Sequence, residues 1–431
     1  MELTPEQQAL LDGSRGPAMA KVVRTLVMYG ECFGAKRMVP VSGERGHLVT
    51  SFGLSMLKPV YDLMDELIAG GAISGQEFSA DPRPLDPAVP ANPLQRLLFH
   101  IMYSKQDDYE TQLKAMGLMG KDAFTCTCYL PEVGNRPHRG DVLSWAESSA
   151  VVFANSVLGA RCNRNSGIIE MFGSIAGFVP EFGLLTDEGR RATWVVEVCC
   201  EHKPEAQVLG SAIGMKVMED VPYIKGLDHW LGNELSRDAE DYLKDMGAAS
   251  ASNGAVGLYH VDGLTPEAVE LGEAGLVAPG AQVYRIDDAE LERVRAGYPV
   301  VWKNPAAKPR LCFIGCPHLS ASQLKDWSRR IVDGLAVAGK KRVQVPMVLT
   351  AAPAVAEAFR RTADYERLAA TGAVLSSICP LMYTNNPLCG GMPIITNSNK
   401  LRTYSTSRYY TDEEVLTYVT RGSFEKKGGD R

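Results

Sequence analysis

The chain has 431 residues, which is enough for two or three domains with a large hydrophobic core. It is 45% hydrophobic and 22% charged with a formal net charge of -6, so it lacks the basic excess that is typical of nucleic-acid-binding proteins. It contains no run of about 18 apolar residues and begins without a basic segment followed by an apolar one. We therefore expect a cytoplasmic globular protein that binds neither nucleic acid nor membrane.

The first half of the chain is predicted to be mainly helical. Thr4 is a suitable N-cap for a helix that starts at Pro5. A second helix is followed by a short strand and by a Gly-rich polar turn that contains His47. After a third helix, residues 73–93 are rich in proline and polar side chains, which is typical of a long loop or of a linker between domains.

In the second half, predicted strands alternate with predicted helices. Residues 191–200 form an apolar strand, and residues 281–297 give a strand followed by a helix. The same order recurs at residues 310–335 and again from residue 373. This alternation predicts an α/β fold with mostly parallel sheets. Ligands of such sheets bind beyond the carboxyl ends of the strands, where residues 396–400 are also expected to lie.

Three cysteines that are far apart in the sequence follow predicted strands: Cys126, Cys316 and Cys379. Disulfides are not expected in the cytoplasm, and none of the ten cysteines forms a C-x-x-C pair of the zinc-ribbon type. Cysteines that converge in space can nevertheless hold a metal cluster. Because a helix is predicted to begin after Cys316, we expect the pKa of this thiol to be lowered. A buried thiol of the core explains the residues equally well at this point.

The choice between neighbouring cysteines follows from strand geometry. Cys126 and Cys128 occupy alternate positions of one predicted strand, so they face opposite sides and only one can enter a shared site. Cys126 lies between two threonines whose hydroxyl groups could bond to sulfur, and we expect it to be the one.

Polar residues that could act on a substrate lie in loops and at helix ends. Glu147 is either a carboxylate at a helix start or a buried acid, and Ser148 follows it. The loop with Asn163 and Arg164 combines amide and cationic groups that suit substrate binding. The segment TNSNK, which contains Ser398 and Lys400, has the composition of a site for a small anionic substrate. The candidates are therefore His47, Glu147, Ser148, Asn163, Arg164, Ser398 and Lys400.

Several motifs together resemble the large, catalytic part of the aconitase X family, a divergent branch of the aconitase superfamily. They are GSRGPAMAKVVRTLVMYGE, FTCT at 124–127, WAESSAVVFANSVLGARCNRN, IGCPHLS, the Cys379-Pro380 pair and TNSNK with Tyr404. The resemblance covers residues 1–431 and implies an aconitase-like fold of three α/β domains around a cluster-binding cleft. It also implies an iron–sulfur cluster, of the 2Fe–2S, 3Fe–4S or 4Fe–4S type, bound by Cys126, Cys316 and Cys379.

The resemblance implies an activity as well. Members dehydrate a hydroxylated acid, and we expect cis-3-hydroxy-L-proline as the substrate, with Δ1-pyrroline-2-carboxylate as the product. Mevalonate 5-phosphate is the alternative substrate, and a cluster-free scaffold or regulatory subunit is an alternative of another class. His47, Glu147 and Ser148 are then candidates for catalysis. Asn163, Arg164, Ser398 and Lys400 would bind the substrate.

The family also has a small swivelling domain that we do not find in this chain. We therefore expect a heterodimer with a separate small subunit, which would carry the catalytic base. Two positions depart from the family pattern, because Cys162 and Asn165 stand where relatives have a threonine and an acid. The loop that follows Lys400 also differs, so these departures bear on the substrate rather than on the fold.

Overall fold

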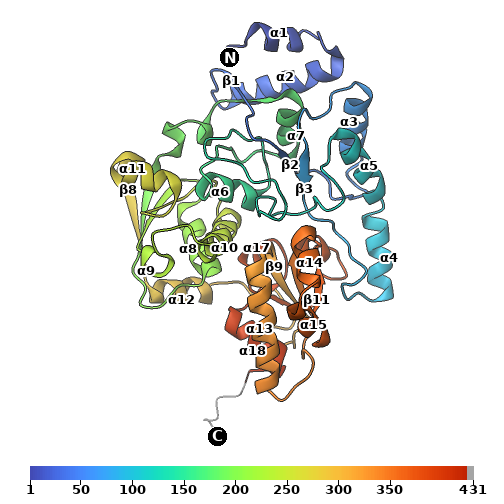
Figure 1. The fold of residues 1–431 in the computed structure, drawn as a ribbon, viewed down its shortest axis with the longest axis vertical. Helices are drawn as coiled ribbons and strands as arrows, with labels where there is room; N and C mark the ends of the chain where they lie inside the picture. Colours follow the sequence, from blue (N-terminus) through green and yellow to red (C-terminus); the bar gives the residue numbers. More distant parts are fainter. Residues whose placement is uncertain (425–431) are drawn as a thin grey trace.

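The computed structural model describes residues 1–424 of the chain. Its strands form a four-stranded sheet, a five-stranded sheet and two sheets of two strands each. Figure 1 shows three parts arranged around a common centre, with the N-terminal part at the top and the C-terminal part at the bottom. Within the described residues, no helix is long and apolar enough to cross a membrane.

The first part packs helices around the two small sheets. Its elements are α1 (Pro5–Leu11), α2 (Gly16–Cys32), β1 (Met38–Pro40), β2 (Gly46–Leu48), α3 (Lys58–Ala69), β3 (Phe78–Ala80), α4 (Pro93–Met102), α5 (Gln106–Met116), α6 (Ser148–Ser156), α7 (Gly167–Ala176), β4 (Phe178–Pro180), η1 (Gly183–Leu185) and η2 (Glu188–Arg190). β2 pairs in parallel with β3, and β1 pairs antiparallel with β4. Thr4 caps α1 as predicted, in a capping box with Gln7.

The second part is built on a parallel sheet in the order β7-β6-β5-β8. Its elements are β5 (Ala192–Val198), α8 (Ala206–Val217), β6 (Pro222–Lys225), α9 (Asp228–Leu231), α10 (Arg237–Asn253), β7 (His260–Val261), α11 (Pro266–Leu276), β8 (Val277–Ile286) and α12 (Asp288–Ala296). The long α10 packs against α8 and α6, so it reaches from this part to the first.

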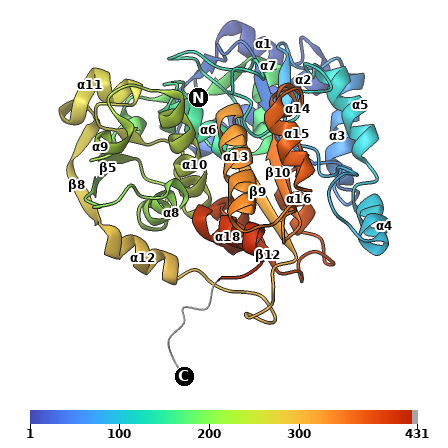
Figure 2. The same cartoon turned by 60° about the horizontal axis from the view of Figure 1, so that its bottom comes forward.

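The third part has a five-stranded parallel sheet in the order β11-β10-β9-β12-β13. Its elements are β9 (Leu311–Leu319), α13 (Ala321–Val337), β10 (Met347–Ala351), α14 (Pro353–Arg360), α15 (Ala363–Ala370), β11 (Val374–Ser376), α16 (Pro380–Thr384), β12 (Ile394–Thr396), α17 (Asn399–Tyr404), β13 (Arg408–Tyr409) and α18 (Asp412–Arg421). Every residue of the central strand β9 is buried. Figure 2 shows α13 beside α15 on one face of this sheet.

The α/β class and the mostly parallel sheets are confirmed, whereas three local expectations differ. Residues 73–93 contain β3, so this stretch is not uniformly a loop. The segment around Cys126 is a loop that a single bridge from Phe124 to Ala80 attaches to β3. The segment from Cys316 to His318 lies inside β9, whereas Cys316 was expected to follow a strand.

Helix α4 connects the first part to the third. The rings of Phe99 and Tyr383 pack at a tilt of 47° with their centroids 5.2 Å apart, and the Tyr103 hydroxyl donates to the carbonyl oxygen of Met382 at 2.8 Å. The chain therefore passes from β3 across to the third part and back before it reaches Cys126. This path brings residues 81–83 beside α16.

Candidate active site

Three cysteines meet at one cavity of about 230 Å³. Cys126 comes from the loop beside β3, Cys316 from β9 and Cys379 from the N-cap of α16. All ten cysteines of the chain are free thiols, and the other seven do not line this cavity. The structure thus brings together the three thiols that the sequence singled out, and it separates Cys126 from Cys128.

Local backbone geometry explains how Cys316 reaches the cavity. Gly315 has a φ of +104°, and a side chain there would overlap the carbonyl oxygen of Thr350 on β10. The Thr350 hydroxyl group also donates to Gly315 O at 2.5 Å. A glycine is therefore required where the strand bends to present Cys316.

The thiols do not have lowered pKa values. Burial raises the pKa of Cys126 and of Cys316, with the ammonium group of Lys400 acting in the opposite direction. Burial raises the pKa of Cys379 to about 12. The expected effect of a following helix on Cys316 was wrong, because this residue lies inside the buried strand β9 and Ser320 forms the cap of α13.

A buried ion pair forms another wall of the cavity. Glu147 is the N-cap of α6 and accepts hydrogen bonds from Ala150 N at 2.6 Å and from the Ser149 hydroxyl group at 2.7 Å. The Nζ atom of Lys400 pairs with Glu147 and also donates to Ser148 Oγ at 3.2 Å. Burial raises the pKa of Glu147, but Lys400 and the other hydrogen-bond donors outweigh it and hold that pKa below its ordinary value. Both members of the pair are therefore charged.

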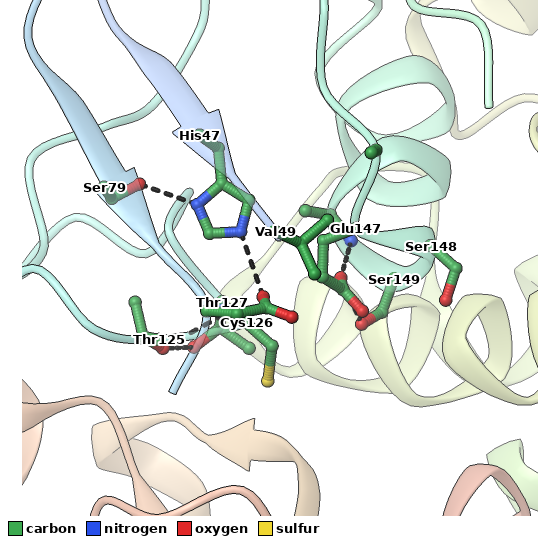
Figure 3. Close-up of polar contacts among 12 residues, drawn as sticks. His47, Val49, Ser79, Thr125, Cys126, Thr127, Glu147, Ser148 and Ser149 are labelled. Carbon is green, nitrogen blue, oxygen red and sulfur yellow. Dashed lines mark hydrogen bonds and ion pairs between the residues drawn. The ribbon is translucent and has the colours of Figure 1, made fainter. Parts of the chain in front are cut away.

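His47 is fully buried behind the cavity and does not line it. Figure 3 shows its ring next to Ser79, whose hydroxyl group lies 2.8 Å from Nδ1. The other nitrogen, Nε2, lies 3.3 Å from Oδ1 of Asp81. Asp81 lines the cavity. His47 consequently acts on the cavity only through the carboxyl group of Asp81.

Asp81 was missed by sequence reasoning because it falls in the Pro-rich stretch 73–93. The available signal was its position immediately after a short apolar strand, where sheet-edge ligands lie. Burial raises the pKa of Asp81, and the hydrogen bond from His47 opposes this rise. Its carboxyl group therefore has a higher proton affinity than an exposed aspartate.

Three expected substrate-binding residues do not line the cavity. The Asn163 amide is used by the backbone, since it donates to Phe182 O at 3.0 Å and accepts from Leu184 N at 2.8 Å. Ser398 caps α17 and donates to Cys316 O. These two side chains hold the backbone in place instead of lining the cavity.

Arg164 is the third of these residues. Its guanidinium group is partly buried, and burial lowers its pKa while nearby Tyr404 and Glu147 oppose this. No hydrogen bond or ion pair to Arg164 is found within residues 1–424. An unpaired cation therefore lies near the ion pair without lining the cavity.

Glu170 on α7 was also missed, although it positions two walls of the cavity. Its carboxyl oxygens accept hydrogen bonds from Val49 N and from Ala146 N, both at 2.7 Å, and both of these residues line the cavity. Glu170 is completely buried. Its neighbour Gly167 packs so closely on Val49 O that any side chain would overlap that atom.

The fold and site define a three-domain α/β protein with three thiols where its first and third domains meet. Family profiles match in the same order: aconitase X first domain at residues 1–188, second domain at 192–296 and third domain at 309–415. The chain belongs to the aconitase X family.

Relatives in this family carry two names. The phosphomevalonate dehydratase large subunit of Thermococcus kodakarensis is 31% identical over 419 residues, which are 94% of this chain and 95% of that protein. That of Methanothermobacter thermautotrophicus is 32% identical over 385 residues, 86% of each chain. The cis-3-hydroxy-L-proline dehydratase of Pseudomonas aeruginosa is 27% identical over 416 residues, 92% of this chain but 65% of that protein.

A solved structure supports the same assignment. The crystal structure of Thermococcus kodakaraensis aconitase X in its holo-form superposes with a TM-score of 0.79 at 28% identity. The match covers 97% of this chain and 100% of that chain. The aconitase-like fold predicted from the sequence is therefore confirmed.

Proposed function

We propose that this chain is the large subunit of a hydro-lyase that removes water from a small hydroxylated carboxylic acid. The observation that carries the proposal is the meeting of Cys126, Cys316 and Cys379 in one cavity beside a charged lysine and a carboxyl group. Relatives named dehydratases, some of them large subunits, support the reaction class and a small-subunit partner.

The donor set fits an iron–sulfur cluster. The three thiols have no disulfide partners, and Cys126 Sγ already accepts a hydrogen bond from the backbone N–H of His318 at 3.5 Å. We assign Cys126, Cys316 and Cys379 as the residues that hold the cluster. When bound, the cluster supplies an iron that acts as a Lewis acid on the hydroxyl group that leaves.

The residues of the chain then have distinct tasks. Ser148 presents its hydroxyl group to the substrate carboxylate, and Lys400 supplies a positive charge beside it, held in place by Glu147 and Ser149. Asp81, supported by His47, is the lining carboxyl group that lies outside the Lys400–Glu147 pair. We assign it to move a proton at the leaving hydroxyl group. In line with the family resemblance, we assign the base that takes the C–H proton to the small subunit.

The charges of the cavity favour cis-3-hydroxy-L-proline as the substrate. Among the described residues, the lining contains two carboxyl groups, of Asp81 and Glu147, and the single ammonium group of Lys400. This balance suits a molecule with a single carboxylate, which can face Lys400, and with an amine that meets no second ammonium group in the lining. A molecule with several negative charges would find fewer cations than it needs.

Mevalonate 5-phosphate is the second candidate, and a different observation favours it. The phosphomevalonate dehydratase large subunit of Thermococcus kodakarensis matches nearly end to end, whereas the Pseudomonas aeruginosa cis-3-hydroxy-L-proline dehydratase is longer than this chain. Arg164 is an unpaired cation near Glu147 and could meet a phosphate group. A small subunit would have to supply further cations.

The experiment is to express this chain with its small subunit anaerobically, to assign the cluster type by electron paramagnetic resonance and to assay both compounds. Turnover of one compound identifies the substrate. Cluster formation without turnover of either would reject both substrates. An absence of any iron–sulfur signal after reconstitution would favour the scaffold alternative.

A matched pair of variants tests the ligand assignment. Cys316→Ser should lose the cluster and the activity while the fold is retained, because one of the three thiolates is removed. Cys312 lies on the same buried strand but outside the cavity, so Cys312→Ala should keep both the cluster and the activity. Unchanged turnover in Cys316→Ser would rule out the assignment.

A further inference from the structure

His318 lies where the three domains meet, and all four of its polar groups are hydrogen bonded. Its ring nitrogens Nδ1 and Nε2 each lie 3.0 Å from a partner, Thr125 Oγ1 and Ile378 O respectively. Its backbone N–H donates to Cys126 Sγ at 3.5 Å, and its carbonyl oxygen accepts from Lys244 Nζ at 3.3 Å. Thr125 and Cys126 belong to the first domain, Lys244 to the second and Ile378 to the third.

These bonds define one arrangement of protons on the ring. A carbonyl oxygen can only accept, so Nε2 carries a hydrogen and donates it to Ile378 O. Nδ1 is then free to accept from the hydroxyl group of Thr125. Thr125 Oγ1 itself accepts from Thr127 N at 3.1 Å, which orients that hydroxyl group.

The partners of His318 are the immediate neighbours of the thiols. Thr125 precedes Cys126, Ile378 precedes Cys379, and His318 itself is two positions beyond Cys316 on β9. Within residues 1–424, no other hydrogen bond joins the segments 125–126, 316–318 and 378–379 to one another. His318 lines the cavity but has no exposed surface of its own, so the loss of one bond would leave a buried polar group without a partner.

We propose that His318 is a positioning residue that fixes the three cysteine-bearing segments at the spacing that a metal cluster requires. The hydrogen bond from Lys244 to the carbonyl oxygen of His318 also links His318 to the second domain. This inference rests on the proposed function, in which the three thiols are metal ligands. It adds that their convergence is built into the protein by hydrogen bonds and does not depend on the metal. Residues that orient ligands in this way typically contribute about 10- to 100-fold to metal affinity.

Conservative variants separate the two ring contacts. Asparagine at 318 can place its carbonyl oxygen near the position of Nδ1, and glutamine can place its amide N–H near that of Nε2. His318→Asn should thus keep the bond from Thr125, and His318→Gln should keep the bond to Ile378. Thr125→Val removes the bond between Thr125 and His318, which His318→Gln also removes. Valine has nearly the same volume as threonine. His318→Ala removes both contacts.

The test is an anaerobic titration of the apo chain with Co²⁺, followed by the thiolate-to-cobalt charge-transfer absorption. Iron and sulfide contents after reconstitution are the second readout. We expect His318→Ala to weaken Co²⁺ binding by about 10- to 100-fold. His318→Asn, His318→Gln and Thr125→Val should show smaller losses, and they report on the proposal if the alanine variant does not fold.

The control is Tyr409→Phe. It removes a different bond between the second and third domains, from the Tyr409 hydroxyl group to Glu205 at 2.7 Å. It should lower the urea midpoint without changing Co²⁺ affinity. Variants of His318 that lose stability like this control but bind Co²⁺ as the wild type does would overturn the proposal, since His318 would then only join domains. A wild-type chain that takes up neither Co²⁺ nor a cluster would instead overturn the proposed function.

Discussion

The ammonium group of Lys400 and the carboxylate of Glu147 form an ion pair that is almost entirely buried, with side-chain exposures of 11% and 6%. Glu147 belongs to the first domain and Lys400 to the third. The pair therefore joins these two domains at the cavity. Each charge is compensated mainly by the other, so the pair behaves as one unit.

Removing one member of this pair should be strongly destabilising. Lys400→Met leaves the Glu147 charge buried without its partner, and we expect the free energy of unfolding to fall by about 3–5 kcal/mol. The double variant Lys400→Met/Glu147→Gln should recover part of this loss. Urea unfolding measures the free energy of unfolding of the single and of the double variant. Equal losses in the single and double variants would contradict the compensation. The exposed pair Lys21–Glu66 is a control, where Lys21→Met should cost less than about 1 kcal/mol.

Asp81→Asn tests the assigned proton transfer. An amide cannot take or give the proton, so kcat of the reconstituted enzyme should fall by about 10²- to 10⁴-fold. Cluster content and the urea midpoint should stay near the wild-type values. His47→Gln should lower kcat less, because His47 acts only through Asp81. A wild-type kcat in Asp81→Asn would remove this residue from the mechanism.

Gly167→Ala should disturb one wall of the cavity. The added methyl group would overlap the carbonyl oxygen of Val49, so α7 and the end of β2 must move apart. We expect a loss of about 1–3 kcal/mol in urea unfolding, together with reduced activity. Gly75→Ala is the matched control, since a side chain there meets nothing within 4 Å. Similar behaviour of the two variants would show that this close approach is unimportant.

Glu205 should make stability depend on pH. Burial and the nearby charge of Asp412 raise the pKa of Glu205 to about 7, against the opposing hydrogen bonds from Tyr409 and Asp412 N. The folded state binds the proton of the Glu205 carboxyl group more tightly than the unfolded chain does. The stabilisation of the folded state by this proton is therefore complete at low pH. It is lost as the pH rises from the unfolded value of 4.5 to about 7.

The expected size of this loss is on the order of 2–3 kcal/mol. Glu205→Gln keeps a neutral side chain at every pH, so urea midpoints of the variant and the wild type should diverge between pH 5 and 7. The measurement is a series of urea titrations across that range. If the urea midpoints of the variant and the wild type changed in parallel with pH, the raised pKa of Glu205 would be contradicted.

Local sequence signals predicted much of the fold. Alternating strands and helices indicated the parallel sheets, and caps such as Thr4 and Ser320 lie where helices begin. The signals failed where contacts between distant segments decide the conformation. Cys316 was expected to follow a strand, yet β9 continues through it to Leu319, which pairs with Ala351 of β10.

Contacts between distant segments also explain why the candidate site was predicted only in part. Cysteines and charged groups after strands are visible in a sequence, and six of the ten candidates line the cavity: Cys126, Glu147, Ser148, Cys316, Cys379 and Lys400. Whether an amide such as Asn163 faces a ligand or a backbone carbonyl depends on the distant segment 182–184. The importance of Asp81 likewise depends on the pairing of β2 with β3, which places His47 beside it.

The cavity combines one thiol from the first domain with two from the third, and this order has a consequence during synthesis. Roughly 250 residues separate Cys126 from Cys379, which at about 5–20 residues per second corresponds to a delay of about 10–50 s on the ribosome. During that time Cys379 is not available to meet Cys126. The three thiols of the cavity can therefore meet only in a late step, when the C-terminal domain docks.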